Sequence, residues 1–301
     1  MSKLLLAGAS ALAIATAGQA AAADRSAPWQ AQIGDTATVQ TMSKGGAGIT
    51  IAIVDTGVLA SNPEIYGRVS SLSSCAAVTF SCANGYTDDN SHGTAVAAIA
   101  GGKYSATAPI SMSGVAPAAT IIAEKVLSAS GTGYSTDVAN GIIKAADAGA
   151  KVINLSLTYS SSSTVVKAIN YATAKGAVIV WAGGNSATNF NGGANTTGLT
   201  TASLQRMIFV GSVSSTNVIS SFSNKPGTAS AYAGSTSAKY SSLWLVAPGQ
   251  GIIAPYATNG NNSFSAWTGT SMSAPEVAGG VALLEAAWPI LYTKGTASIV
   301  L

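Results

Sequence analysis

The sequence predicts an α/β fold with three layers, in which a mostly parallel sheet carries helices on both faces. Short apolar runs rich in β-branched residues recur along the chain at strand length. The segments between them carry apolar residues at three- and four-residue spacing, which is typical of amphipathic helices. Because strands and helices alternate, we expect βα units that place the strands side by side and parallel.

The predicted elements are spread along the chain without a linker or an internal repeat. Strands are expected at Ile49–Val54, Thr120–Leu127, Lys151–Leu157, Gly176–Trp181, Met207–Val213 and Leu243–Ala247. Helices are expected at Ala95–Gly101, Ser135–Ala148, Thr164–Lys175 and Val277–Leu284. We therefore expect one domain over residues 48–301. Ligands of such sheets bind beyond the carboxyl ends of the strands, so residues that directly follow these runs are candidates for a site.

The first 23 residues have the features of a signal peptide. Lys3 precedes an apolar run that begins at Leu4, and the small residues Ala20–Ala23 suit cleavage. A membrane anchor is the alternative, but the run is short and rich in alanine. We expect export, to the medium or to the cell surface, with residues 24–47 forming a short N-terminal segment of the mature or pro region.

The composition agrees with an exported protein. Charged residues make up only 8% of the 301 residues, and Ser, Thr, Asn and Gly supply much of the polar surface. The net charge of +3 is not gathered in Lys and Arg clusters, so we expect neither nucleic acid nor a membrane surface as a partner. Cys75 and Cys82 are close enough for a local disulfide, which an oxidising compartment favours over two free thiols or a zinc site.

Gly269–Pro275 is a small-residue turn that leads into the last predicted helix. Such a turn would lift the hydroxyl of Ser271 clear of its neighbours and leave unpaired backbone N–H groups beside it. Serine and threonine also favour helix starts for structural reasons, so this segment alone does not identify a nucleophile.

A serine nucleophile needs a base, which is usually a histidine held by a carboxylate. The chain has a single histidine, His92, at the start of a small-residue helix. Asp55 directly follows the first buried strand, where a carboxylate is shielded from water. The candidate catalytic residues are therefore Asp55, His92 and Ser271, in that order along the chain.

The three motifs IAIVDTG, DDNSHGT and GTSMSAP carry these residues. From about Gly48 to Ala287 the chain resembles the subtilisin family of serine endopeptidases, whose triad has the same order. The resemblance implies a three-layer subtilisin-like fold and hydrolysis of peptide bonds through an acyl-enzyme. It also implies that Asn185, which follows a predicted strand, is the side-chain donor of the oxyanion hole.

The resemblance further implies two edges that would hold a polypeptide substrate as an added strand. The expected substrate-binding residues are Gly131, Thr132, Gly133, Ser156, Leu157, Thr158, Ala182, Gly183 and Gly184. Because main-chain pairing reads shape more than side chains, we expect broad specificity.

The chain departs from the family at several positions. Ala95 and Glu276 stand where the family commonly has histidines, and we expect Glu276 to cap the first turn of its helix. Thr158 replaces a usual glycine and Trp181 a usual small residue, so the primary specificity pocket should differ in size and shape. Many relatives bind structural calcium, but residues 88–90 alone do not define a site, and we predict no metal and no cofactor.

The motifs leave two other functions open. An ester or lipid hydrolase is disfavoured because the G-x-S-x-G elbow is absent at Ser271 and the triad order differs. A catalytically silent peptide-binding or passenger domain is the alternative from another class. The family usually continues past Ala287, so we expect a chain truncated at its C-terminus. A C-terminal outer-membrane barrel, as in autotransporter proteases, is one expected continuation. We expect the segment given by this sequence to be a monomer.

Overall fold

The computed structural model describes residues 28–105, 112–158, 162–190, 196–231, 239–256 and 263–291. The predicted signal peptide and the end of the chain after Leu291 lie outside these residues. Of the helices in the described part of the chain, none is long and apolar enough to cross a bilayer.

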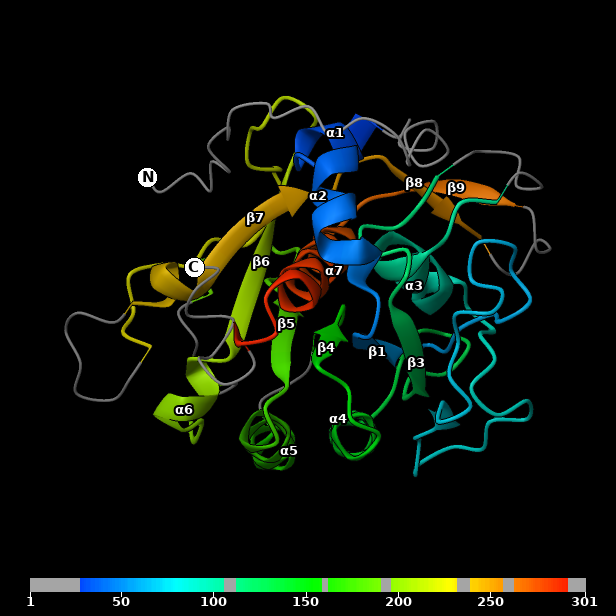
Figure 1. The fold of residues 1–301 in the computed structure, drawn as a ribbon. Helices are drawn as coiled ribbons and strands as arrows, with labels where there is room; N and C mark the ends of the chain where they lie inside the picture. Colours follow the sequence, from blue (N-terminus) through cyan, green and yellow to red (C-terminus); the bar gives the residue numbers. More distant parts are fainter. Residues whose placement is uncertain are drawn as a thin grey trace.

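A seven-stranded parallel sheet forms the middle layer, as predicted (Figure 1). In spatial order its strands are β2 (Ser74–Cys75), β3 (Thr120–Lys125), β1 (Thr50–Asp55), β4 (Val152–Leu155), β5 (Val178–Ala182), β6 (Met207–Val213) and β7 (Trp244–Pro248). The six predicted strands are all present, with bounds that differ by at most two residues at each end. A short hairpin of β8 (Ile252–Pro255) and β9 (Phe264–Trp267) lies apart from the sheet and was not predicted.

Helices cover both faces of the sheet (Figure 1). The helices are α1 (Pro28–Gln32), α2 (Ala37–Ser43), α3 (His92–Gly101), α4 (Ser135–Asp147), α5 (Ser163–Ala174), α6 (Thr201–Leu204) and α7 (Thr270–Ala287), with 3-10 turns at Lys44–Gly46 and Tyr240–Leu243. One apolar core joins the sheet to α3 and α7, and a second core joins its other face to α4 and α5. The residues of β1 alternate between the two cores, as expected for a strand buried on both faces.

The segment before β1 is folded onto the domain. Trp29 is buried, and the side chain of Gln30 donates to the carbonyl of Ser113 at 2.8 Å. The helix α2 packs against α7, and the Nε2 group of Gln40 donates to the carbonyl of Val115 at 2.7 Å. These contacts tie residues 28–47 to the same core as α3 and α7.

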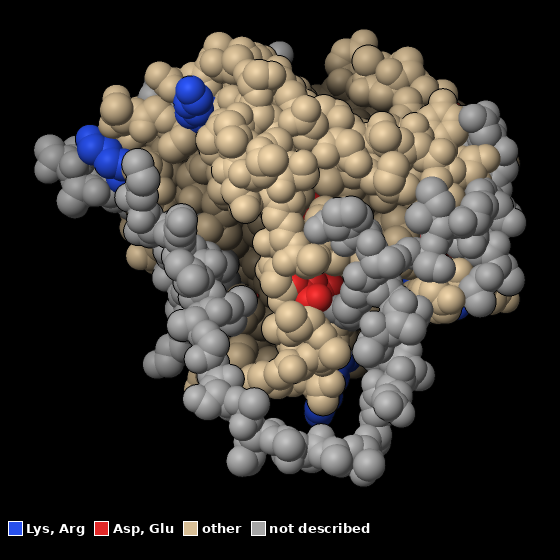
Figure 2. Space-filling view, turned by 90° about the horizontal axis from the view of Figure 1, so that it is seen from above, with Lys and Arg blue, Asp and Glu red and all other residues tan. Residues whose placement is uncertain are grey.

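A disulfide joins Cys75 and Cys82, which confirms the predicted pair. Cys75 ends β2 at the edge of the sheet, so the bond fixes the loop that leaves this edge strand. On the face seen from above, the described Lys, Arg, Asp and Glu side chains are few and stand apart (Figure 2).

Candidate active site

Three segments that are distant in the sequence meet beyond the carboxyl ends of the central strands. Asp55 is the last residue of β1, His92 is the first residue of α3, and Ser271 is the second residue of α7. The fold places α3 and α7 on the same face of the sheet, with their N-termini near the end of β1. The sheet topology therefore brings the three predicted catalytic residues into one region.

Asp55 and His92 form a hydrogen-bonded pair. The distance between His92 Nδ1 and Asp55 Oδ1 is 2.8 Å, and the same carboxylate oxygen accepts the N–H of Thr56 at 2.7 Å. The side chain of Asp55 is fully buried, whereas that of His92 is 23% exposed. Since a carboxylate can only accept, Nδ1 carries a proton, and Nε2 of a neutral ring is free to accept one.

Burial and charge act on His92 in opposite directions. Burial lowers the pKa of His92, but the negative charge of Asp55, its hydrogen bond to the ring and the charge of Asp88 together outweigh burial. The net result is a pKa above the ordinary histidine value of 6.5. The carboxylates therefore stabilise the imidazolium that a general base becomes when it takes a proton.

Asp88 fixes the loop that carries His92. Its Oδ1 accepts from Thr56 Oγ1 and from the backbone N–H groups of Asn90 and Ser91, at 2.9 to 3.0 Å. Its Oδ2 accepts from the N–H and the hydroxyl of Thr94, at 2.9 and 2.6 Å. With five donors on one carboxylate, Asp88 shapes the approach to His92 and has no free oxygen for a cation.

A close backbone contact holds β1 and α3 together at this point. A Cβ on Gly93 would lie 2.1 Å from the carbonyl oxygen of Gly57, so only glycine fits there. The N–H of Gly93 donates to Thr56 Oγ1 at 2.9 Å. The Gly residues of the DTG and SHGT motifs thus bring the Asp55 and His92 segments within hydrogen-bonding reach.

The helix α7 begins at Thr270, seven residues earlier than the predicted start at Val277. Pro275 lies inside the helix and has no N–H to donate to the carbonyl of Ser271, four residues earlier. Ser156 Oγ donates to that carbonyl instead, at 2.8 Å. Ser156 thereby compensates for the proline and lets Ser271 occupy the first turn, where backbone N–H groups lack acceptors within the helix.

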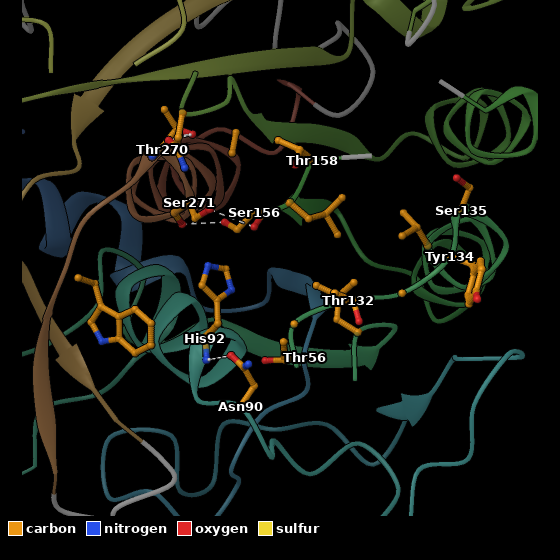
Figure 3. Close-up of a pocket in the computed structure, with 18 residues that line it drawn as sticks. Thr56, Asn90, His92, Thr132, Tyr134, Ser135, Ser156, Thr158, Thr270 and Ser271 are labelled. Atoms are coloured by element: carbon orange, nitrogen blue, oxygen red, sulfur yellow. Dashed lines mark hydrogen bonds between the residues drawn. The ribbon is translucent and has the colours of Figure 1, made fainter. Parts of the chain in front are cut away.

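The hydroxyl of Ser271 faces the cleft beside His92. It donates to the backbone carbonyl of Ser156 at 3.1 Å, and the imidazole of His92 is directed toward it from the other side (Figure 3). Both side chains line one cleft of about 710 Å³. The resting hydroxyl is thus bonded to Ser156, and it would have to turn to donate to His92.

Asn185 is held by Thr270, the residue before Ser271. Its Oδ1 accepts from both the N–H and the hydroxyl of Thr270, each at 2.9 Å. These two donors identify the oxygen of the amide and leave its NH₂ group as the donor available at the cleft, which Asn185 lines. The sequence marked Asn185 but not its partner Thr270.

Most of the predicted substrate-binding residues surround the cleft. Its walls include Gly131, Thr132, Gly133, Ser156, Leu157, Thr158, Ala182 and Asn185. Gly183 instead lines a neighbouring cavity of about 170 Å³, which shares Thr158 and Ala182 with the cleft. Gly184 lines neither space, and its N–H donates to Thr270 Oγ1 at 3.1 Å.

Several residues of the cleft were not identified from the sequence. Trp267 of β9 lines it and packs edge-on to His92, with ring centroids 6.0 Å apart. Tyr134 and Ser135 at the start of α4 lie at its far end (Figure 3), and Val138 of α4 also lines it. The aromatic residue Trp267 lies only four positions before Ser271, and this proximity was the signal available in the sequence.

The expected role of Glu276 is wrong. Glu276 is the seventh residue of α7, beyond its first turn, and both carboxyl oxygens are buried without a hydrogen-bond partner among the described residues. Burial raises the pKa of Glu276 well above its ordinary value, which favours the neutral acid inside the core. In the described part of the chain, no group of three or more His, Cys, Asp and Glu residues converges as a metal site would require.

Comparison with known proteins links this geometry to one family. The model of the subtilase family, Peptidase_S8, matches residues 46–299. The chain is 38% identical to a thermophilic serine proteinase of Bacillus sp. (strain AK1) over 81% of its length and 53% of the relative's. It is 34% identical to subtilisin DY of Bacillus licheniformis over 84% of the chain and 82% of the relative. Among solved structures, Sphericase aligns with a TM-score of 0.68 at 30% identity, over 87% of each chain.

Proposed function

Since the chain belongs to the subtilase family, we infer that it is an exported serine endopeptidase that hydrolyses peptide bonds with Ser271 as the nucleophile. The observation that carries this inference is the 2.8 Å bond between Asp55 and His92 at the wall of the cleft that holds Ser271. A buried carboxylate, an imidazole and a serine at a helix N-terminus are the parts that acyl transfer needs.

The proposed reaction begins when the Ser271 hydroxyl leaves the carbonyl of Ser156 and donates to His92 Nε2. His92 then takes the proton as Ser271 Oγ attacks the scissile carbonyl, and later gives it to the leaving amine. Water repeats the cycle on the acyl-enzyme and releases the acid. Asp55 keeps the proton on Nδ1 throughout and stabilises the imidazolium.

We assign the developing oxyanion to two donors. One is the NH₂ group of Asn185, whose orientation Thr270 fixes through two hydrogen bonds. The other is the N–H of Ser271 in the first turn of α7, where the helix dipole also favours negative charge. Donors that are aligned before the reaction need no reorganisation in the transition state.

The substrate is proposed to lie between Gly131–Gly133 and Ser156–Thr158. The first edge is rigid, since Ser128 N–H donates to the carbonyl of Thr132 at 2.8 Å and Gly131 N–H to that of Ser128 at 2.9 Å. Pairing with the peptide main chain would give broad specificity. The cavity behind Thr158 and Ala182 would take the side chain that precedes the scissile bond.

Labelling with a fluorophosphonate probe tests this function. We expect the full-length protein to be labelled at Ser271, and Ser271→Ala to be unlabelled. His92→Ala should lose nearly all labelling and peptide hydrolysis, because the sequence contains no second histidine to act as base. Folded, full-length protein that binds peptides but is not labelled would favour the silent binding domain instead.

A further inference from the structure

Lys125 is a buried cation beside the catalytic pair that the reaction described above does not use. Its side chain is 2% exposed, and it is the last residue of β3. In the parallel sheet Lys125 pairs in register with Asp55 on β1. On β1, Ile51 and Ile53 pack into the core of α3 and α7, and so do their partners on β3. Because side chains alternate along a strand, Asp55 and Lys125 point to this same face.

The ammonium group bonds to three separate segments. It donates to the carbonyl of Thr56 at 2.6 Å, to Asp89 Oδ1 at 2.6 Å and to the carbonyl of Leu127 at 3.0 Å. Thr56 follows Asp55, Asp89 lies three residues before His92, and Leu127 leads into the Gly131–Gly133 edge. All three donor positions of the ammonium are therefore used.

We propose that Lys125 is a positioning residue for the catalytic site: it joins the turn after Asp55, the loop before His92 and the substrate edge through one buried charge. This proposal rests on the proposed function, because it assigns Lys125 to the same triad. The exposed partner Asp89, which is 52% exposed, completes the ion pair from the solvent side. A neutral side chain of similar length could fill the space but could not hold the three segments together.

The charge of Lys125 also opposes the carboxylates around His92. Asp55 faces the ring from β1, Asp88 and Asp89 belong to the loop before α3, and Lys125 reaches this loop from β3. The other elements at the ring contribute Trp267 from β9 and Ser271 from α7, which do not titrate near neutral pH. A cation disfavours the imidazolium and an anion favours it, so Lys125 and Asp89 should act on the pKa of His92 with opposite signs.

The single histidine makes this measurable by NMR, in active or inactive protein. We expect Lys125→Met to raise the pKa of His92 by about half a unit or more, and Asp89→Asn to lower it by a few tenths of a unit. Lys125→Met should also reduce kcat by about tenfold or more with little change in KM, whereas Lys125→Arg, which keeps the charge, should recover most of the rate.

Several outcomes would overturn the proposal. A folded Lys125→Met protein with the parent's kcat and His92 pKa would show that the ammonium group only fills space. If Lys125→Met does not fold, two other results would overturn the proposal. One is an unchanged His92 pKa in Asp89→Asn, and the other is a folded but inactive Lys125→Arg protein. Parent protein that resists the fluorophosphonate probe would refute the proposed function, while the NMR titrations would still decide the role of Lys125.

Discussion

Ser156 contacts Ser271, the proposed nucleophile, twice, and the two contacts do different things. Its hydroxyl donates to the carbonyl of Ser271 that Pro275 leaves without a helical donor. Its own carbonyl accepts the Ser271 hydroxyl, on the side of the cleft that faces the ring of His92. A residue expected at a substrate edge therefore also orients the hydroxyl of Ser271.

Asn185 provides the first prediction at this scale. Asn185→Ala removes the proposed oxyanion donor and leaves Asp55, His92 and Ser271 in place. We therefore expect kcat to fall by about 10²- to 10³-fold, the loss typical of removing such a donor in subtilisin, while KM changes little. Steady-state kinetics on a short peptide substrate measures it.

Thr270→Val is the matched control for that variant. It keeps Asn185 and removes one of the two donors to its Oδ1, so the loss should be smaller, within about tenfold. If Asn185→Ala kept kcat within about threefold of the parent, the amide would not be an oxyanion donor.

Thr158 provides a prediction about specificity. It lines both the cleft and the 170 Å³ cavity, and its methyl group lies 3.9 Å from where a Cβ on Gly184 would be. Thr158→Gly should widen the entrance and raise kcat/KM for a substrate with Phe before the scissile bond, relative to Ala, by about tenfold or more. Hydrolysis of paired peptides with Ala or Phe at that position gives the ratio.

The control for this change is Thr132→Gly, on the opposite edge. Thr132 lines the cleft but not the cavity, so its removal should leave the Phe-to-Ala ratio nearly unchanged. Equal effects of the two variants would mean that the cavity behind Thr158 does not receive a substrate side chain.

At the scale of elements, six strands of the main sheet and the ends of α4 and α5 were predicted to within two residues, whereas α3 and α7 begin earlier than predicted. Apolar, β-branched runs buried on both faces leave a clear pattern, and all six were found. The start of α7 was placed too late because Pro275 and the small residues around it are typical of a turn. The serine that compensates for the proline lies 115 residues before Ser271, so the local sequence does not reveal it.

The same reasoning explains the missed hairpin. In β9 the two end residues, Phe264 and Trp267, are partly buried and the two residues between them are exposed, which is not the alternation typical of a strand. The partner strand β8 is only four residues long. Elements this short are stabilised by contacts such as that of Trp267 with His92 and Tyr256, which depend on the folded chain. Consequently the proposed triad and Asn185 could be listed from motifs, whereas the contacts that Thr270, Trp267 and Lys125 make required the structure.

For the molecule as a whole, buried acids connect stability to pH. Burial raises the pKa of Glu64 to about 8 and that of Glu124 to about 7, and it raises the pKa of Glu276 well above its ordinary value. Backbone or side-chain hydrogen bonds offset burial only in part for Glu64 and Glu124. In unfolded chains these acids titrate near pH 4.5, so above that pH the folded protein binds more protons than the unfolded protein.

The free energy of unfolding should therefore fall as pH rises from about 5 to 8, by up to about 1.4 kcal/mol per pH unit for each acid still protonated in the folded state. Denaturation by guanidinium at several pH values measures this, in the Ser271→Ala background to prevent self-digestion. Glu276→Gln, which cannot ionise, should reduce the slope and be more stable than its parent at pH 8, with a small difference at pH 5.

Asp137→Asn supplies the control of opposite sign. Although burial raises the pKa of Asp137, hydrogen bonds from Thr79, Val78 and Tyr134 outweigh burial, and the net pKa is lowered. The carboxylate therefore stabilises the fold above about pH 4 and loses this contribution as pH falls through its lowered pKa, so Asp137→Asn should destabilise the protein throughout the range from 5 to 8. If Glu276→Gln kept the slope of its parent, the buried acid on α7 would already be ionised in the folded protein, which requires a compensating cation or water beside it.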